Sequence, residues 1–514
     1  MPITCKTVKY DFTITNTTLV PDGVERLVLA VNGQMPGPLI EANWGDTIEV
    51  TVRNALTNNG TVMHWHGMRQ NYTNEMDGVA SITQCPIAPG DSMTYTFKAS
   101  NYGTSWYHSH YAIQTYEGVF GPMIIHGPHS DDSYDEEEMI VLQDWNHIPV
   151  DALLDKAQSV AAGGPTTLDT GLINGMNVWK GAGKRYEMTV TSGNTYLIRL
   201  VNVAIQSTFK FYIDGHKMKV IGMDYVPLVP YETTILNINP GQRYDVLVTF
   251  DQTVGDYWMR SDNQQVCSSL TNSNDIKAMV HYSGGPMGTP ASTAYTYTSE
   301  CIDEPYGKLV PYAPMDAGEE DAEIAENVVI GAVNNLFKWS LNGVTFFADW
   351  NDPTLYSIYN NGTVPDYSGN LAIEVPNLNE WVYVIIESPI PSPHPIHLHG
   401  HDFLVLAQGL GSYTSSTALN LKNPPRRDVA ILPGNAATRQ SGYLVIAWKT
   451  DNPGAWLLHC HIGWHAAMGF ALQIIENLDG IKDTVKQPAN LNDNCASYNA
   501  YAAQNGIGTA DSGI

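Results

Sequence analysis

Ten of the 16 histidines in this chain lie in four short motifs. These are HWHG at 64–67, HSH at 108–110, HPIHLHG at 394–400 and HCHIGWH at 459–465. Imidazole and thiolate are strong ligands for copper, zinc and iron, so this concentration predicts metal binding. Each motif contains the pattern His-x-His. Residues i and i+2 of a strand point to the same side, so each pair directs two imidazoles at one place.

The four pairs together supply eight imidazoles from two distant parts of the chain. They are His64 and His66, His108 and His110, His397 and His399, and His459 and His461. If the pairs converge, they provide two or three ligands for each of about three metal ions. The sequence therefore predicts a cluster of metal ions.

Cys460 stands between two of these histidines and points to the opposite side of its strand. Its natural partners are His465, five residues further on, and His394, which belongs to no His-x-His pair. One thiolate and two imidazoles form the trigonal ligand set of a blue-copper electron-transfer site. Zinc also takes Cys and His, but a structural zinc site needs neither this back-to-back arrangement nor four histidine pairs. We expect two adjacent metal centres that share one strand.

The remaining histidines are expected to have ordinary structural roles, because a lone buried histidine is usually just hydrogen-bonded. They are His126, His129, His147, His216, His281 and His401.

Length and charge restrict the class of protein. A chain of 514 residues predicts two to four domains, and its net charge of −26 argues against nucleic acid or anionic membranes as partners. No segment is suited to span a membrane, and the first residues, MPITCKTVKYD, are not a signal peptide. N-glycosylation sequons occur at Asn16, Asn59, Asn71 and Asn361. They favour a secreted, glycosylated protein whose signal is absent from this chain, and we expect a monomer.

The other cysteines suggest disulfides. Cys267 and Cys301 enclose a short polar stretch and could pair, and Cys85 with Cys495 would join distant parts of the chain. Cys5 is left without a partner.

Alternating apolar and polar residues predict strands throughout, separated by Pro, Gly, Asn and Asp. Examples are 46–54, 91–99, 186–193, 243–250 and 379–388. Asn-Gly dipeptides recur near 32, 174 and 342, and a Pro-Gly-Asp/Gln phrase recurs before 91–97 and 242–248. We predict an all-β protein of three consecutive β-sandwich or barrel domains, at 1–127, 128–310 and 311–514. Acidic stretches at 131–138 and 316–323 are expected to be solvated linkers.

Taken together, the four histidine motifs resemble those of the multicopper oxidases, and within them the fungal, ascomycete-type laccases. NGQMPGP, MDGVASITQCPIAPG, PGQRYDV and NPPRRDVA are also similar to family sequences. The resemblance covers nearly the whole chain. It implies three cupredoxin-like Greek-key domains, four copper ions, and phenols or aromatic amines oxidised while O2 is reduced to water.

The resemblance also implies the role of each ligand. His394, Cys460 and His465 would hold the type 1 copper, and His64 and His397 the type 2 copper. One type 3 ion would have His66, His108 and His461, and the other His110, His399 and His459. A phenol would give its electron at His465, and Cys460 would pass it to the cluster.

Further positions are expected from the family pattern. Phe470 takes the axial position of the type 1 site, cannot coordinate, and so raises the potential, whereas Met468 is expected to pack. A methionine at the axial position would have pointed toward bilirubin or ascorbate oxidase types. Asp77 and Asp511, with the carboxylate of Ile514 in the terminal DSGI, would lie near the cluster and supply protons.

Two features depart from the pattern. The segment that carries a substrate-binding acid in related laccases has Gln206 here, so the substrate pocket formed with His465 has an amide. Cys5 also lacks its usual nearby partner. A dedicated phenol-coupling oxidase of secondary metabolism therefore stays an alternative to a broad laccase. A copper protein that transfers electrons without oxidase activity is a further alternative, although it would need only the Cys460 site.

Overall fold

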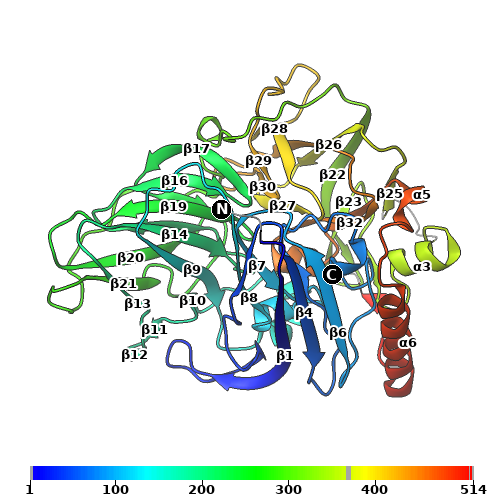
Figure 1. The fold of residues 1–514 in the computed structure, drawn as a ribbon, viewed down its shortest axis with the longest axis horizontal. Helices are drawn as coiled ribbons and strands as arrows, with labels where there is room; N and C mark the ends of the chain where they lie inside the picture. The colour runs from blue at the N-terminus through cyan, green and yellow to red at the C-terminus, as the bar shows by residue number, and fades with distance from the viewer. Residues whose placement is uncertain (1–3, 366–371, 509, 512–514) are drawn as a thin grey trace.

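The structure is a computed structural model that describes residues 4–365, 372–508 and 510–511. Strands dominate, and they form three pairs of sheets that follow one another along the chain (Figure 1). The all-β prediction is confirmed. Within the described residues, no helix is both long and apolar enough to cross a membrane.

The first sandwich consists of two four-stranded sheets that face each other. The first sheet has the order β2 (Arg26–Val31), β1 (Thr7–Leu19), β4 (Thr47–Asn54), β6 (Ser92–Lys98). The second has the order β3 (Ile40–Asn43), β8 (Phe120–His126), β7 (Gly103–His108), β5 (His64–Trp65). Two of the histidine pairs thus begin on neighbouring strands, β5 and β7.

The second sandwich carries no histidine motif. Its six-stranded sheet runs β10 (Thr170–Ile173), β9 (Glu136–Trp145), β14 (Thr195–Asn202), β19 (Arg243–Thr249), β16 (Met218–Met223), β17 (Val226–Thr233). Its five-stranded sheet runs β13 (Glu187–Val190), β21 (Lys277–Tyr282), β20 (Asp256–Asn263), β15 (Phe209–Ile213), β18 (Leu236–Ile238). A small hairpin of β11 (Val178–Trp179) and β12 (Ala182–Gly183) precedes β13.

The third sandwich repeats the plan of the second. One sheet runs β23 (Leu336–Leu341), β22 (Ala322–Val333), β26 (Trp381–Ser388), β31 (Gly442–Lys449), β28 (Phe403–Leu410), β29 (Arg426–Arg427). The other runs β25 (Ala372–Val375), β33 (Ala471–Glu476), β32 (Gly454–Cys460), β27 (His394–Leu398), β30 (Val429–Leu432). The remaining pair joins β24 (Ala348–Asp349) to β34 (Ala510–Asp511).

The Asn-Gly dipeptides mark the same turn in each sandwich. The backbone φ is positive at both residues of each dipeptide: 53° and 76° at Asn32 and Gly33, 49° and 73° at Asn174 and Gly175, 48° and 82° at Asn342 and Gly343. Each turn is closed by an antiparallel bridge: Val31 to Gln34, Ile173 to Met176, Leu341 to Val344. Two positive φ values define a type I′ turn, which Asn-Gly favours. The sequence repeat is therefore a structural repeat.

Helices are few, and the sequence analysis did not predict them. They are α1 (Gln114–Glu117), α2 (Val150–Gln158), α3 (Thr354–Asn361), α4 (Gly463–Ala467), α5 (Leu478–Ile481) and α6 (Pro488–Asn505), with 3₁₀ turns at Asn74–Met76 and Tyr306–Lys308. α6 follows the third sandwich and packs back on the first. Cys495 in α6 forms a disulfide with Cys85, and Ser497 Oγ donates to Asp91. Both expected disulfides are present, and Cys5 is exposed and free.

The prediction that 131–138 is a solvated linker was wrong for 136–138, whereas 131–135 lie outside strands and helices and are largely exposed. Glu136 begins strand β9, which pairs with β14, and Glu137 forms an ion pair with Arg199 at 3.0 Å. Glu138 accepts a hydrogen bond from the Tyr186 hydroxyl at 2.6 Å. The last three residues of the acidic run therefore belong to the sheet, and Glu137 and Glu138 have partners on the sandwich.

Candidate metal centre

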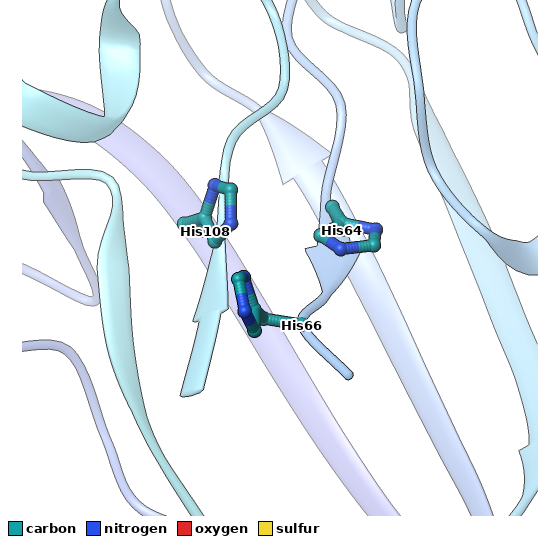
Figure 2. Close-up of side chains that lie close together, drawn as sticks. All are labelled: His64, His66 and His108. Atoms are coloured by element: carbon teal, nitrogen blue, oxygen red, sulfur yellow. The ribbon is translucent and has the colours of Figure 1, made fainter. Parts of the chain in front are cut away.

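The histidine pairs of the first and third sandwiches converge. His64 is the register partner of His108 across β5 and β7, and His397 is the partner of His459 across β27 and β32. The exposed fraction of each of the eight paired histidines is at most 4%. Figure 2 shows how the rings of His64, His66 and His108 lie together. A single group of imidazoles thus forms between sandwiches that are far apart in sequence.

The potential ligand atoms fall into overlapping sets whose members lie within 4.8 Å of one another. The sets are His64, His66 and His108; His64, His397 and His399; and His110, His399 and His459. The ring of His461 lies 5.1 Å from that of His66 and 5.9 Å from that of His108. All eight predicted cluster histidines are therefore brought together.

Hydrogen bonds orient these rings so that their other nitrogens face inward. Nδ1 of His64 donates to the Asp77 carbonyl at 2.8 Å, and Nδ1 of His397 donates to the Asp428 carbonyl at 2.7 Å. Among the described residues, Nε2 of both rings is buried without a hydrogen-bond partner, as are Nε2 of His108 and both nitrogens of His461. Buried polar atoms are rarely left unpaired, so these lone pairs fit a bound metal ion.

The protonation of the rings agrees with this role. Burial, followed by the neighbouring histidines, holds the pKa of His66, His108, His110, His397, His399 and His461 well below the usual value. Burial also lowers the pKa of His459 to about 4. A lowered pKa favours the neutral form of these seven rings, and neutral imidazole is the form that binds metal.

Asp77 lies where the family pattern placed it, beside the cluster. Its carboxylate accepts a hydrogen bond from Nδ1 of His399 at 2.9 Å and lies 3.2 Å from Nδ1 of His64. One buried acid thus touches histidines from the first and the third sandwich. Such a carboxylate orients the rings and increases their basicity.

A second acid, Asp428, supports the cluster from the other side, and the sequence analysis did not single it out. Its Oδ1 accepts a hydrogen bond from Nε2 of His66 at 3.2 Å, which leaves Nδ1 of His66 facing inward. Arg243, from the second sandwich, donates to both carboxylate oxygens of Asp428. Asp224 and Arg427 extend this buried network, with Arg427 Nε 3.0 Å from Asp224 Oδ2. The PGQRYDV and NPPRRDVA phrases contain these arginines and Asp428. Their similarity to family sequences was the signal that could have identified this network.

The predicted second centre is assembled as well. His394, Cys460 and His465 form a set of three potential ligands. Sγ of Cys460 lies 3.5 Å from Nδ1 of His465 and 3.8 Å from Nδ1 of His394, and the two nitrogens are 3.1 Å apart. A trigonal ion with bonds of about 2.0 Å to nitrogen and about 2.3 Å to sulfur needs edges of about 3.5 and 3.7 Å. The triangle has the right size for such an ion.

The surroundings of this centre are apolar. Burial lowers the pKa of His394 to about 3 and raises the pKa of the Cys460 thiol. The ring of Phe470 lies 5.1 Å from the ring of His394, and the indole of Trp339 lies 4.3 Å from the ring of His465. Met468 is buried in the core, where its carbonyl accepts a hydrogen bond from the Trp339 backbone N–H at 3.0 Å.

The two centres share one strand end. Cys460 closes β32, between His459 and His461, which face the histidine cluster. Nδ1 of His459 donates to the Cys460 carbonyl at 2.9 Å, which adds a hydrogen-bonded link to the covalent one. The prediction of back-to-back sites on the HCH motif agrees with this geometry.

Gln206 lies beside the Cys460 centre, and its side-chain oxygen already accepts a hydrogen bond. Its Oε1 accepts a hydrogen bond from the indole Nε1 of Trp464 at 2.7 Å, and Trp464 precedes His465. The buried carboxylate of Asp144 accepts the amides of Ile205, Gln206 and Ser207 and fixes this loop. The amide side chain therefore holds the segment next to His465.

The structure describes only part of the C-terminal segment that was predicted to lie near the cluster. The backbone of Asp511 pairs with Ala348 in β24, in the third sandwich. Ile514 lies outside the described residues.

The six remaining histidines agree with structural roles. His126 contacts Glu41, His147 contacts Asp22, and His401 contacts Glu476. His216 contacts the Tyr282 hydroxyl, His281 contacts Asp256, and His129 contacts Arg199.

Three multicopper oxidase family models match the chain, at residues 13–130, 136–285 and 342–479. Laccase-1 of Botryotinia fuckeliana is 45% identical, over 98% of this chain and 89% of the relative. Dihydrogeodin oxidase of Aspergillus terreus is 38% identical, over 99% of this chain and 91% of the relative. The crystal structure of the laccase from Botrytis aclada matches with a TM-score of 0.93 and 42% identity, covering 99% of this chain and 95% of that one.

The chain therefore belongs to the multicopper oxidases. Its three sandwiches are cupredoxin-like domains, and it is an oxidoreductase that uses copper. The fungal laccases are similar to it over nearly its full length.

Proposed function

We propose that the chain is a laccase-type oxidase that removes single electrons from phenols and aromatic amines and reduces O2. Four substrate electrons and four protons convert one O2 to two waters. The observation that carries this proposal is the cluster of eight buried imidazoles beside the Cys460 triangle. A pure electron carrier needs only the triangle.

The proposed holders of four copper ions follow the family roles. His394, Cys460 and His465 hold the type 1 ion; His64 and His397 hold type 2; His66, His108 and His461 hold one type 3 ion; and His110, His399 and His459 hold the other. Bound copper supplies one-electron redox chemistry at the first site and four-electron reduction of O2 at the other three ions.

His465 is the proposed point of electron entry. Its exposed fraction is 9%, whereas the exposed fraction of the other proposed ligands does not exceed 4%. Cys460 shares the first site with His465 and is the chain neighbour of His459 and His461, so an electron taken up at His465 can reach the histidine cluster through Cys460. The electron donor itself does not need to enter the cluster. Keeping the two sites apart lets a one-electron donor serve a four-electron acceptor.

Asp77 is the proposed proton-handling acid, because its buried carboxylate touches His64 and His399 together. We give Asp511 the same role from the third domain. The domain limits proposed remain 1–127, 128–310 and 311–514. A secreted glycoprotein is supported by the four sequon asparagines, which are all exposed. We also propose that it acts as a monomer.

The range of substrates follows from Gln206. Oε1 accepts from Trp464 and keeps a second lone pair, so the amide can accept a hydrogen bond from a phenol or donate one to it, but it cannot take the phenol's proton. The phenol proton must therefore go to a base other than Gln206.

The proposal is tested by measuring O2 uptake by the copper-loaded protein with a panel of phenols and a non-phenolic dye. Uptake with many phenols and with the dye supports a broad laccase. Uptake with a single phenol class would indicate a dedicated coupling oxidase. A blue protein that consumes no O2 with any donor would refute the oxidase.

A further inference from the structure

A hollow of about 790 Å³ opens on the second domain, over β13, β20 and β21 and beside the β11–β12 hairpin. Its lining includes Met176, Val178, Trp258 and Met279, together with the charged residues Lys184, Arg185 and Glu187. In Figure 1 these strands lie at the lower left, away from β27 and β32, which carry proposed copper ligands. The hollow is therefore separate from the candidate metal centre.

The floor of the hollow is a partly exposed indole held in place by two cations. Trp258 is the register partner of Met279, so their side chains stand together on one face of the sheet. The guanidinium carbon of Arg185 lies 5.3 Å from the ring centroid of Trp258, and Nζ of Lys277 lies 5.4 Å from it. Arg185 is itself fixed by Asn177 Oδ1 at 2.9 Å. Such contacts orient the ring before any ligand arrives.

Three cations, Lys184, Arg185 and Lys277, outnumber two carboxylates here, Asp275 and Glu187, in a chain whose net charge is −26. Glu187 lies 3.7 Å from Nε2 of His281. Asp275 accepts one contact from Arg185, at 2.8 Å, and one from Lys277, at 3.0 Å, so a single carboxylate serves two cations. Lys184 is exposed and forms no ion pair with any residue that the structure describes. The hollow thus offers one uncommitted ammonium group next to an apolar aromatic floor.

We propose that this hollow binds a planar aromatic carboxylate. The ring would lie on the indole of Trp258, with the thioethers of Met176 and Met279 at its edges, since sulfur packs well against aromatic rings. The carboxylate would meet Lys184. One uncommitted cation suits a monoanion, and a neutral sugar would leave it without a partner.

Binding is tested by titrating the copper-loaded protein with 2-naphthoate by calorimetry. This probe has no phenol or amine group, so it is not a substrate of the proposed oxidase. We expect one naphthoate per chain and affinity that falls as salt is added. The neutral analogue 2-naphthalenemethanol should bind about tenfold more weakly, because it lacks the charge-assisted contact.

Three variants locate the site. Trp258→Leu and Lys184→Gln should each weaken naphthoate binding about tenfold, the first by removing the ring contact and the second by removing the charge. Lys217→Gln, at an exposed lysine elsewhere on the same domain, should leave the affinity unchanged. Unaltered dye oxidation checks that each variant is folded. The inference is overturned if naphthoate does not bind, if Lys184→Gln binds it as well as the wild type does, or if the alcohol binds equally well.

Discussion

Replacing Arg243 with glutamine tests the buried network behind the histidine cluster. The guanidinium group is fully buried and donates from both terminal nitrogens to Asp428, at 2.6 Å for the contact with Oδ2. Its Nε also donates to the Thr104 carbonyl at 3.2 Å. Glutamine is too short to restore the paired contact, so Asp428 keeps a buried charge without its main partner.

Removing one member of a buried ion pair costs about 3–5 kcal/mol of folding free energy. At about 2–4 °C per kcal/mol for a unit of this size, the melting temperature should fall by about 6–20 °C. Asp428 also orients His66, so copper affinity or O2 uptake should fall about 10–100-fold.

Arg260→Gln is the matched control. Arg260 makes a two-point contact with buried Asp214, with both distances 2.8 Å, in the same domain. None of its contacts described here reaches a histidine ligand. Both variants should have a lower melting temperature than the wild type in scanning calorimetry, but only Arg243→Gln should lose copper and O2 uptake. An Arg243→Gln protein with wild-type melting, copper content and O2 uptake would refute the reasoning, and so would an equal copper loss in both variants.

Three further substitutions separate the parts of the site. Asp77→Asn removes the charge shared by His64 and His399, and should lower O2 uptake about 10–100-fold while the blue absorption stays unchanged. A loss of colour would contradict this placement. Phe470→Met puts a thioether beside the Cys460 triangle and should lower the potential, measured by redox titration of the blue band. An unchanged potential would argue against an axial position. Gln206→Glu keeps an acceptor for Trp464 and adds a carboxylate, so KM for phenols should fall while KM for a non-phenolic dye stays constant. Equal changes for both donors would contradict a role in phenol binding.

Local patterns predicted the strands and the ligand motifs well. The segment predicted at 243–250 forms β19 at Arg243–Thr249, and the one at 379–388 forms β26 at Trp381–Ser388. Alternating apolar residues located both strands. The structure buries them on both faces, and each is an inner strand of a six-stranded sheet. The His-x-His pairs were interpreted with the same period, but β5, β7, β27 and β32 each carry only the first histidine of a pair, and the second lies just past the strand end.

Features that depend on distant contacts were not predictable in this way. α6 does carry a helical signal that the sequence analysis missed, because its buried residues are spaced by four, three and four positions: Leu491, Cys495, Tyr498 and Ala502. Its packing on the first domain, where Ser497 donates to Asp91, depends on distant contacts. Asp428 contacts Arg243 across 185 positions of sequence, so local periodicity cannot pair them, although each lies in a phrase similar to family sequences. Gln206 was predicted to face substrate, but its bond to Trp464 depends on two loops meeting in space.

The central claim is that Cys460 holds one copper while its neighbours hold a separate group of three. Copper content and visible absorption, compared between the wild type and Cys460→Ser, test it most directly. We predict a blue wild type with four copper ions per chain, and a colourless, folded variant with three. A colourless copper-loaded wild type, or a Cys460→Ser protein that stays blue, would contradict the account.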